Sequence, residues 1–299
     1  MNQSFSRRDA LKTLTSAAAI GVPTLIANDA LGHATDPIKL KGNIKHSVSR
    51  WCYGSVPFED LCKACKDMGI ASIELTGPDE WPILNKYGLT CAMGWGSWPK
   101  GTGLDNFFNN PKNDEALIAL YQQLIPQAAG LGVTNLICFS GNRRGITDYQ
   151  GLLNCQKVLK KIMPVAEKNK VTITMELLSS RHSHPDYQCD TIEWGAVLCE
   201  MVGSPNFKML YDIFHMQSMG GDHIRNIQRY HQYISHYHTG GMPERHEIDE
   251  RQEIYYPAIM RAIVATGYKG YVGQEYVPTP KDTPGMLASL REGILICDV

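Results

Sequence analysis

The segment L-L-N-C-Q-K-V-L-K-K-I-M-P-V-A-E-K-N-K-V-T-I-T-M-E-L, residues 152–177, contains the pattern that decides the fold. Residues 152–168 have the apolar spacing of an amphipathic helix, and residues 171–177 read as a short strand. A helix that leads directly into a buried strand is the repeating element of folds with a parallel sheet. The segment therefore predicts an α/β protein.

The same alternation recurs from about residue 40 to the C-terminus. The predicted strands are 45–49, 71–75, 90–93, 134–139, 171–177, 207–212, 233–238 and 270–275. The predicted helices include 114–130, 152–168, 191–202, 222–230, 256–266 and 283–296. Eight alternations without a break in composition predict one (β/α)₈ TIM barrel over residues 35–299. The alternative is a doubly wound open sheet, but no Gly-rich phosphate turn follows its first strand.

The N-terminus has a different composition. Residues 4–12 read S-F-S-R-R-D-A-L-K, and residues 13–27 carry no charge. Twin arginines before a moderately apolar stretch are typical of a Tat export signal. We therefore expect residues 1–34 to be a Tat-type signal peptide and the protein to be periplasmic or otherwise exported. If this stretch is instead a helix of the mature fold, the protein is cytoplasmic.

Bulk composition narrows the functional classes. The formal net charge is -1, so no overall basic charge favours nucleic-acid binding. The sequence has no apolar run long enough for a membrane-spanning helix. The nine cysteines are scattered, and Cys62 and Cys65 lie on a predicted helix without a second pair, which favours buried thiols over a zinc site. The expected partner is a small molecule, and a homo-oligomer is left open.

Ionisable residues gather where the predicted strands end. In a TIM barrel the active site lies at the C-terminal ends of the strands. In residues 172–176 the period of two places Glu176 on the same face as two threonines, opposite Ile173 and Met175. Five strand ends carry such a group: Glu74, Glu176, Asp212, His238 and Glu275.

Three carboxylates and one imidazole crowded at one rim would repel each other and lose solvation. A divalent cation resolves that conflict, so we predict a metal site, with Mn²⁺ or Mg²⁺ the best matches and Co²⁺ or Zn²⁺ also compatible. The predicted ligands are Glu176, Asp212, His238 and Glu275. The alternative is that each residue caps a helix or forms a salt bridge at the rim.

Further residues are predicted to contact a substrate. His215 lies three positions after Asp212 and can reach a substrate oxygen, and Arg181 and Arg245 can hold oxygens or a carboxylate. Glu74 fits either a substrate contact or a structural role. Arg143 and Arg144 are weaker candidates, because loop arginines are usually only solvated.

Four segments carry a resemblance to a known family. The sequence resembles the hydroxypyruvate isomerase branch of the xylose isomerase-like barrels, a group that also includes the ketose 3-epimerases. The segments are M-E-L-L-S-S-R (175–181), L-Y-D-I-F-H-M-Q (210–217), H-T-G-G-M-P-E-R-H-E-I-D (238–249) and Y-V-G-Q-E-Y-V-P-T (271–279). The resemblance covers roughly residues 45–299.

The resemblance implies metal ligation by the four predicted ligands, substrate contacts by His215 and Arg245, and proton transfer by Glu176 and Glu275. It implies a metal-dependent isomerase or epimerase that acts on a small keto-sugar or hydroxy-keto acid through an enediolate. Hydroxypyruvate isomerases tend to have glutamine where this chain has His238, whereas the 3-epimerases have histidine. The S-S-R-H-S-H-P segment also differs from the loop of that isomerase, so the substrate stays open.

Three alternatives use the same barrel. A lyase or dehydratase acting on a keto-sugar or inositol derivative would need the same metal and carboxylates. An apurinic-site endonuclease would bind three zinc ions and use more histidines at its strand ends. A non-catalytic sugar-binding module would need neither a metal nor a pair of proton carriers.

Overall fold

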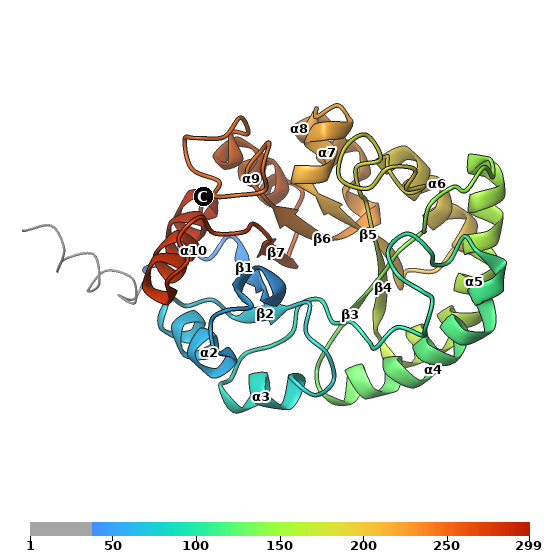
Figure 1. Ribbon diagram of the computed structural model, residues 1–299, viewed down its shortest axis with the longest axis horizontal. Coiled ribbons are helices and arrows are strands. Elements are labelled where there is room, and N and C mark those ends of the chain that lie inside the picture. The colour runs from blue at the N-terminus through green and yellow to red at the C-terminus, as the bar shows by residue number, and fades with distance from the viewer. Residues whose placement is uncertain (1–37) are drawn as a thin grey trace, which may run out of the picture. The chain divides into compact units, whose positions relative to one another are not determined.

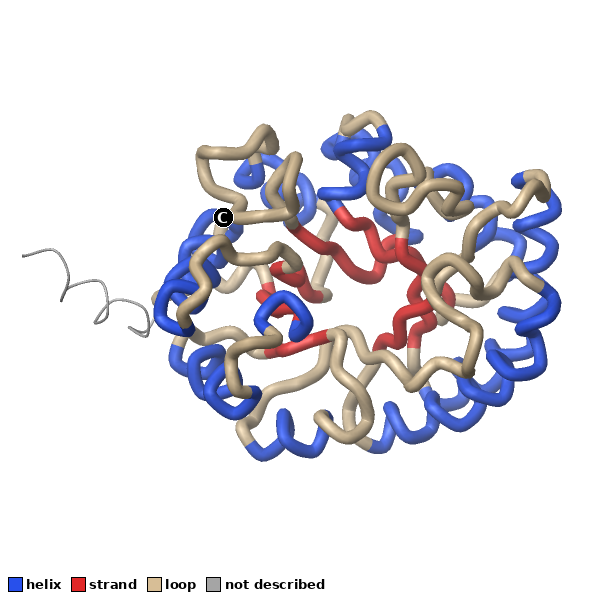
Figure 2. The backbone as a smooth tube through the Cα atoms, in the orientation of Figure 1, coloured by secondary structure: helices blue, strands red, loops and turns tan. Residues whose placement is uncertain are grey.

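The computed structural model describes residues 38–299, and the predicted signal peptide at residues 1–34 therefore falls outside the described residues. Strands form the centre and helices surround them (Figures 1 and 2). Seven strands pair in parallel in the order β2-β1-β7-β6-β5-β4-β3. Their bounds are β1 Lys45–Ser49, β2 Ser72–Glu74, β3 Asn135–Cys138, β4 Thr172–Glu176, β5 Phe207–Asp212, β6 Ile234–Thr239 and β7 Tyr271–Gln274.

Residues 90–94 close the ring between β2 and β3. This segment makes single parallel bridges to both strands, and the Ile137 N–H donates to the Gly94 carbonyl at 2.9 Å. The prediction of a regular strand at 90–93 is wrong, although the segment takes the eighth position. The physical reason lies at Ala92, whose N–H donates to the Ser72 hydroxyl and whose carbonyl accepts from the Asn135 amide. Side chains thus use the backbone groups that a strand ladder would need.

The helices lie outside the strands, as a TIM barrel requires (Figure 1). The predicted helix 114–130 is confirmed residue for residue, and the others agree to within a few residues, whereas α3 and α7 were not predicted. No described helix is long and apolar enough to cross a membrane. The bounds are α2 Phe58–Asp67, α3 Trp81–Lys86, α4 Asp114–Gly130, α5 Asp148–Asn169, α6 Ile192–Val202, α7 Ile213–Met219, α8 His223–Tyr230, α9 Tyr256–Ala265 and α10 Thr283–Cys297.

The core lies between strands and helices. Ile173 and Met175 of β4 are fully buried in it, as their alternation with polar residues predicted. Helix α6 is bounded by the Thr191 hydroxyl, which accepts from the Trp194 N–H, and by Gly203 in the left-handed conformation at φ 69°. All nine cysteines are buried and free, which confirms buried thiols at Cys62 and Cys65.

Candidate active site

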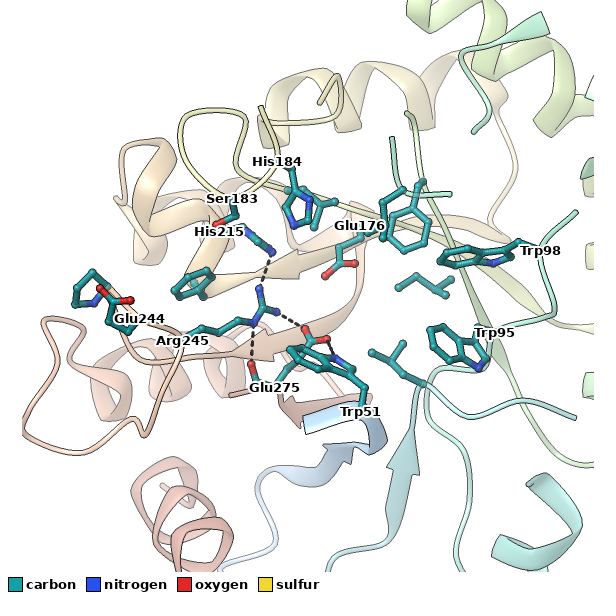
Figure 3. A pocket seen from close by; sticks show the side chains of 17 residues that line it. Trp51, Trp95, Trp98, Glu176, Ser183, His184, His215, Glu244, Arg245 and Glu275 are labelled. Carbon is teal, nitrogen blue, oxygen red and sulfur yellow. Dashed lines mark hydrogen bonds and ion pairs between the residues drawn. The ribbon is translucent and has the colours of Figure 1, made fainter. Parts of the chain in front are cut away.

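A cavity of about 540 Å³ is lined by residues from the C-terminal ends of the strands and from the loops that follow them (Figure 3). One part of its wall is polar, with Glu176, His184, His215, Arg245 and Glu275. The other part is apolar, and three of its seven residues come from the irregular stretch 94–110. Its lining residues are Leu75, Trp95, Trp98, Leu104, Ile137, Phe139 and Leu178.

The four predicted metal ligands come together beside the polar wall. Glu176 ends β4, Asp212 ends β5, His238 lies on β6, and Glu275 directly follows β7. Each offers a ligand atom within 4.8 Å of the others, and all four residues are buried. Glu176 and Glu275 line the cavity, whereas Asp212 and His238 lie behind them. The cluster is consistent with a divalent metal site.

The ring of His238 tests whether this cluster fits a cation. Its Nε2 lies 2.6 Å from Glu74 Oε1, so the proton of a neutral imidazole belongs on Nε2. Within residues 38–299 the buried Nδ1 has no partner in hydrogen-bond geometry, yet it lies 2.6 Å from Glu275 Oε2 and 3.6 Å from Glu176 Oε1. A lone pair among carboxylate oxygens without hydrogen-bond geometry fits a shared cation. The donor set, oxygen plus one imidazole nitrogen, suits a divalent metal.

Asp212 has a structural role and faces the cluster at the same time. Its Oδ1 accepts from the backbone N–H groups of Phe214 (2.8 Å) and His215 (3.3 Å), and so caps helix α7. Its Oδ2 faces Arg245 at 2.7 Å. Both alternatives considered from the sequence, a helix cap and a salt bridge, are therefore present at Asp212, and a cation bound by this residue would share Oδ2 with Arg245 or displace it.

Arg245 lies between the carboxylates and the cavity. Its guanidinium donates to Asp212 Oδ2 (2.7 Å), Glu275 Oε2 (2.6 Å) and His215 Nε2 (2.7 Å). Since arginine only donates, His215 Nε2 must accept, and the ring proton of His215 is on Nδ1. Burial and the nearby Arg245 hold the pKa of His215 well below its usual value, so this ring is neutral.

The backbone around Arg245 is held in an uncommon conformation, with φ at 58°. The Val277 N–H donates to the Arg245 carbonyl (2.7 Å), and Glu247 accepts from the Thr279 N–H (2.7 Å). A side chain at Gly241 would place its Cβ 2.1 Å from the Glu247 carbonyl oxygen. The two hydrogen bonds hold the loop after β6 against the loop after β7, and the short distance explains the glycine at position 241.

The two cavity-lining glutamates differ electrostatically. Burial raises the pKa of Glu176 to about 7. Burial would also raise the pKa of Glu275, but His238 and Arg245 lower it to about 2. Two carboxyl groups whose pKa values are pushed apart at one site can act as acid and base in turn.

Of the predicted substrate contacts, His215 and Arg245 line the cavity, but Glu74 and Arg181 do not. Glu74 is fully buried below His238, so a direct substrate contact does not match its position. Arg181 is exposed and donates to the Ser218 carbonyl at 3.4 Å. His184 of the same loop lines the cavity, whereas Arg181 does not.

Trp51 and His184 line the cavity but were not predicted from the sequence. The Trp51 indole N–H donates to Glu275 Oε1 at 2.6 Å, and its ring lies 5.9 Å from the Arg245 guanidinium. Trp51 follows β1 by two residues, so the strand-end rule applied to β1 would have found it. His184 comes from a loop, where the strand-end rule does not apply.

The family model described as "Xylose isomerase-like TIM barrel" matches residues 62–293. The chain belongs to this family. Its curated relatives include a putative hydroxypyruvate isomerase of Danio rerio, 32% identical over 43% of this chain and 46% of the relative. The match thus spans less than half of that relative. A 2-oxo-tetronate isomerase of Haemophilus influenzae is 27% identical over 78% of this chain and 93% of the relative.

Solved structures share the fold at low sequence identity. An AP endonuclease, family 2, from Brucella melitensis superposes with a TM-score of 0.71 at 22% identity, covering 81% of this chain and 97% of that one. D-Psicose 3-epimerase from Clostridium cellulolyticum H10 gives a TM-score of 0.70 at 17% identity, covering 85% and 98%. These two likenesses confirm the barrel and leave the reaction to be argued from the site.

Proposed function

We propose that this protein is a metal-dependent isomerase or epimerase of a small keto-sugar or hydroxy-keto acid. The observation that carries the proposal is the pair Glu176 and Glu275, which belong to one buried four-ligand cluster and also line the cavity. A binding module would not need two carboxyl groups with opposed pKa shifts beside a candidate metal.

The reaction proposed is proton transfer next to a carbonyl. When bound by Glu176, Asp212, His238 and Glu275, a divalent cation, best Mn²⁺ or Mg²⁺, supplies positive charge beside the substrate oxygens. Glu275, ionised near neutral pH, removes the proton from the carbon next to the carbonyl, and the electron pair moves onto the carbonyl oxygen to give an enediolate. Glu176, which can hold a proton near pH 7, returns one to the neighbouring carbon or to the opposite face.

Neighbouring side chains orient these groups. The Trp51 N–H fixes one oxygen of Glu275, and the Arg245 guanidinium holds the other. His215, neutral and joined to Arg245, is proposed to hold a substrate oxygen from the cavity wall. Return of the proton to the neighbouring carbon gives isomerisation once the adjacent hydroxyl proton has also moved to the former carbonyl oxygen, so that the hydroxyl becomes the new carbonyl. Return of the proton to the opposite face of the same carbon gives epimerisation.

The apolar wall is proposed to pack against the carbon-bound hydrogens of the substrate. Trp98 contacts Trp95, Phe107 and Phe139 edge to face, with ring centroids 5.3–5.8 Å apart, so its ring is held firmly. We expect Trp98→Ala to raise KM about tenfold, or about 1.4 kcal/mol of lost binding, with a smaller change in kcat. The control is Tyr149→Ala, an exposed aromatic of α5 outside the cavity. An unchanged KM in Trp98→Ala would remove the apolar wall from substrate binding.

The test of the proposed reaction is a screen of keto-sugars and hydroxy-keto acids with the Mn²⁺-loaded protein in D₂O, followed by NMR. We expect one substrate class to gain deuterium at the carbon next to the carbonyl and to give an isomer. A product that has lost water would favour the lyase or dehydratase alternative. Bound Mn²⁺ without exchange in any substrate would contradict proton-transfer catalysis.

Export is proposed on the sequence of residues 1–34. We expect changing both Arg7 and Arg8 to lysine to leave the protein uncleaved in the cytoplasm, because the paired guanidinium groups are the export address. Cell fractionation and immunoblotting measure where the protein is located and whether residues 1–34 have been removed, in the wild type and in the double variant. Normal processing of the double variant would show that residues 1–34 are not a Tat signal.

A further inference from the structure

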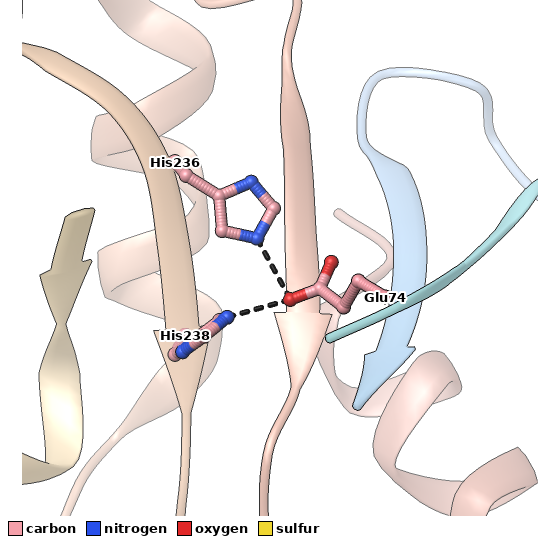
Figure 4. Close-up of side chains that lie close together, drawn as sticks. All are labelled: Glu74, His236 and His238. Carbon is pink, nitrogen blue, oxygen red and sulfur yellow. Dashed lines mark hydrogen bonds and ion pairs between the residues drawn. The ribbon is translucent and has the colours of Figure 1, made fainter. Parts of the chain in front are cut away.

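A second buried cluster lies directly behind His238 (Figure 4). Glu74 ends β2, while His236 and His238 are two residues apart on β6 and therefore share one face of the strand. Glu74 Oε1 lies 2.9 Å from His236 Nε2 and 2.6 Å from His238 Nε2. All three side chains are fully buried, and none of them lines the cavity. The cluster therefore cannot touch a substrate in that cavity directly.

The shared oxygen determines how each ring is protonated. A carboxylate accepts hydrogen bonds and does not donate, so both imidazoles present an N–H at Nε2. In a neutral His238 ring, the form that can ligate a metal, this leaves Nδ1 without a proton, and Nδ1 is the atom that faces Glu176 and Glu275. Glu74 thus selects the one neutral tautomer of His238 that can bind a cation on the side of the carboxylates.

The barrel leaves room for this carboxylate at one glycine. Gly273 of β7 is the strand neighbour of His238, and a Cβ added to it would lie 2.3 Å from Glu74 Oε1. A contact that short does not occur for real side chains. A larger residue at position 273 would therefore displace Glu74 from His238, although it would leave the charge of the cluster unchanged.

We propose that Glu74 is a positioning residue that holds His238 with Nδ1 directed at the metal ligands, and that His236 steadies Glu74. This inference rests on the metal centre of the proposed function. A second cation within Glu74, His236 and His238 is the alternative use of the same residues. The hydrogen-bond distances favour the positioning role, because one carboxylate oxygen already satisfies both rings.

The test measures Mn²⁺ binding to the metal-stripped full chain by titration calorimetry. We expect Glu74→Gln to weaken Mn²⁺ binding about 10- to 100-fold, the usual cost of losing a partner behind a metal ligand. Gly273→Ala, which keeps the carboxylate but takes its space, should weaken binding in the same direction. Asp190→Asn is the matched control, because Asp190 is a buried carboxylate paired with Arg143 and Ser180, outside the ligand cluster.

A positioning role predicts that Glu74 acts only through His238. In a His238→Ala background, Glu74→Gln should therefore cause no further loss of Mn²⁺ affinity. The visible absorption bands of the Co²⁺-loaded chain, which report ligand geometry, should shift in Glu74→Gln and stay unchanged in Asp190→Asn.

Three outcomes would overturn the inference alone. The first is wild-type Mn²⁺ affinity in both Glu74→Gln and Gly273→Ala. The second is a loss of Mn²⁺ affinity on Glu74→Gln that is equally large in the wild-type and His238→Ala backgrounds. The third is the binding of two Mn²⁺ ions per wild-type chain. A wild-type chain that binds no Mn²⁺ would instead overturn the metal-dependent function together with this inference.

Discussion

Glu275→Gln is expected to lower turnover by a factor of about 10² or more while the protein still binds metal. Glutamine keeps the shape of the side chain and one oxygen donor, but it cannot accept a proton from carbon. It can also still accept from the Trp51 indole, which donates to Glu275 Oε1 at 2.6 Å. The measurements are kcat under saturating Mn²⁺ and the metal content of the purified variant.

The matched control is Glu200→Gln, since Glu200 lies on α6 and accepts from the Tyr233 hydroxyl outside the cavity. Near-normal turnover of Glu275→Gln at saturating metal would show that Glu275 is only a ligand. Glu176 would then need a different partner in proton transfer, and His215 is another proton-carrying group on the polar wall.

Asp212→Asn is expected to impair metal binding rather than proton transfer. Asp212 is proposed as a ligand only, so its loss should weaken metal binding by more than the 10- to 100-fold typical of partners behind the ligands. The asparagine oxygen can still cap α7 by accepting from the Phe214 and His215 N–H groups, so the fold should survive. Activity should recover in part at high Mn²⁺ concentration.

The comparison of the two variants is the informative result. Titration of activity against Mn²⁺ should shift the midpoint for Asp212→Asn and lower the plateau for Glu275→Gln. A lowered plateau with an unshifted midpoint in Asp212→Asn would mean that this carboxylate takes part in the chemistry and that the division between ligand and proton carrier is wrong.

The sequence predicted the barrel and the four-residue cluster because both follow from periodicity. A period of two places Glu176 on the opposite face from Ile173 and Met175, and strand ends of a parallel barrel meet at one rim. These rules need no knowledge of loop conformation. The same strand-end rule predicted Asp212, His238 and Glu275, which lie near the ends of successive strands.

The remaining details depend on loops and on three-dimensional neighbours. Arg181 and His184 belong to one irregular loop, and no spacing rule says which of the two faces the cavity. The segment 90–94 lacks a regular ladder because Ser72 and Asn135, distant in sequence, bind its backbone. The position of Glu74 behind His238 likewise required the fold, since a strand end alone does not distinguish a cavity wall from a buried layer.

In the proposed metal centre, the cap that Asp212 places on helix α7 connects a metal ligand to the wall of the cavity. One oxygen holds the start of α7, the other pairs with Arg245, and His215 of α7 lies on the cavity wall. Cations of different ionic radius prefer different distances to carboxylate oxygens. A change of ion would therefore move Asp212, and with it His215, by a fraction of an ångström. Under the proposed function, we therefore expect the same polypeptide loaded with two different ions to rank its substrates differently, without any change in amino-acid sequence.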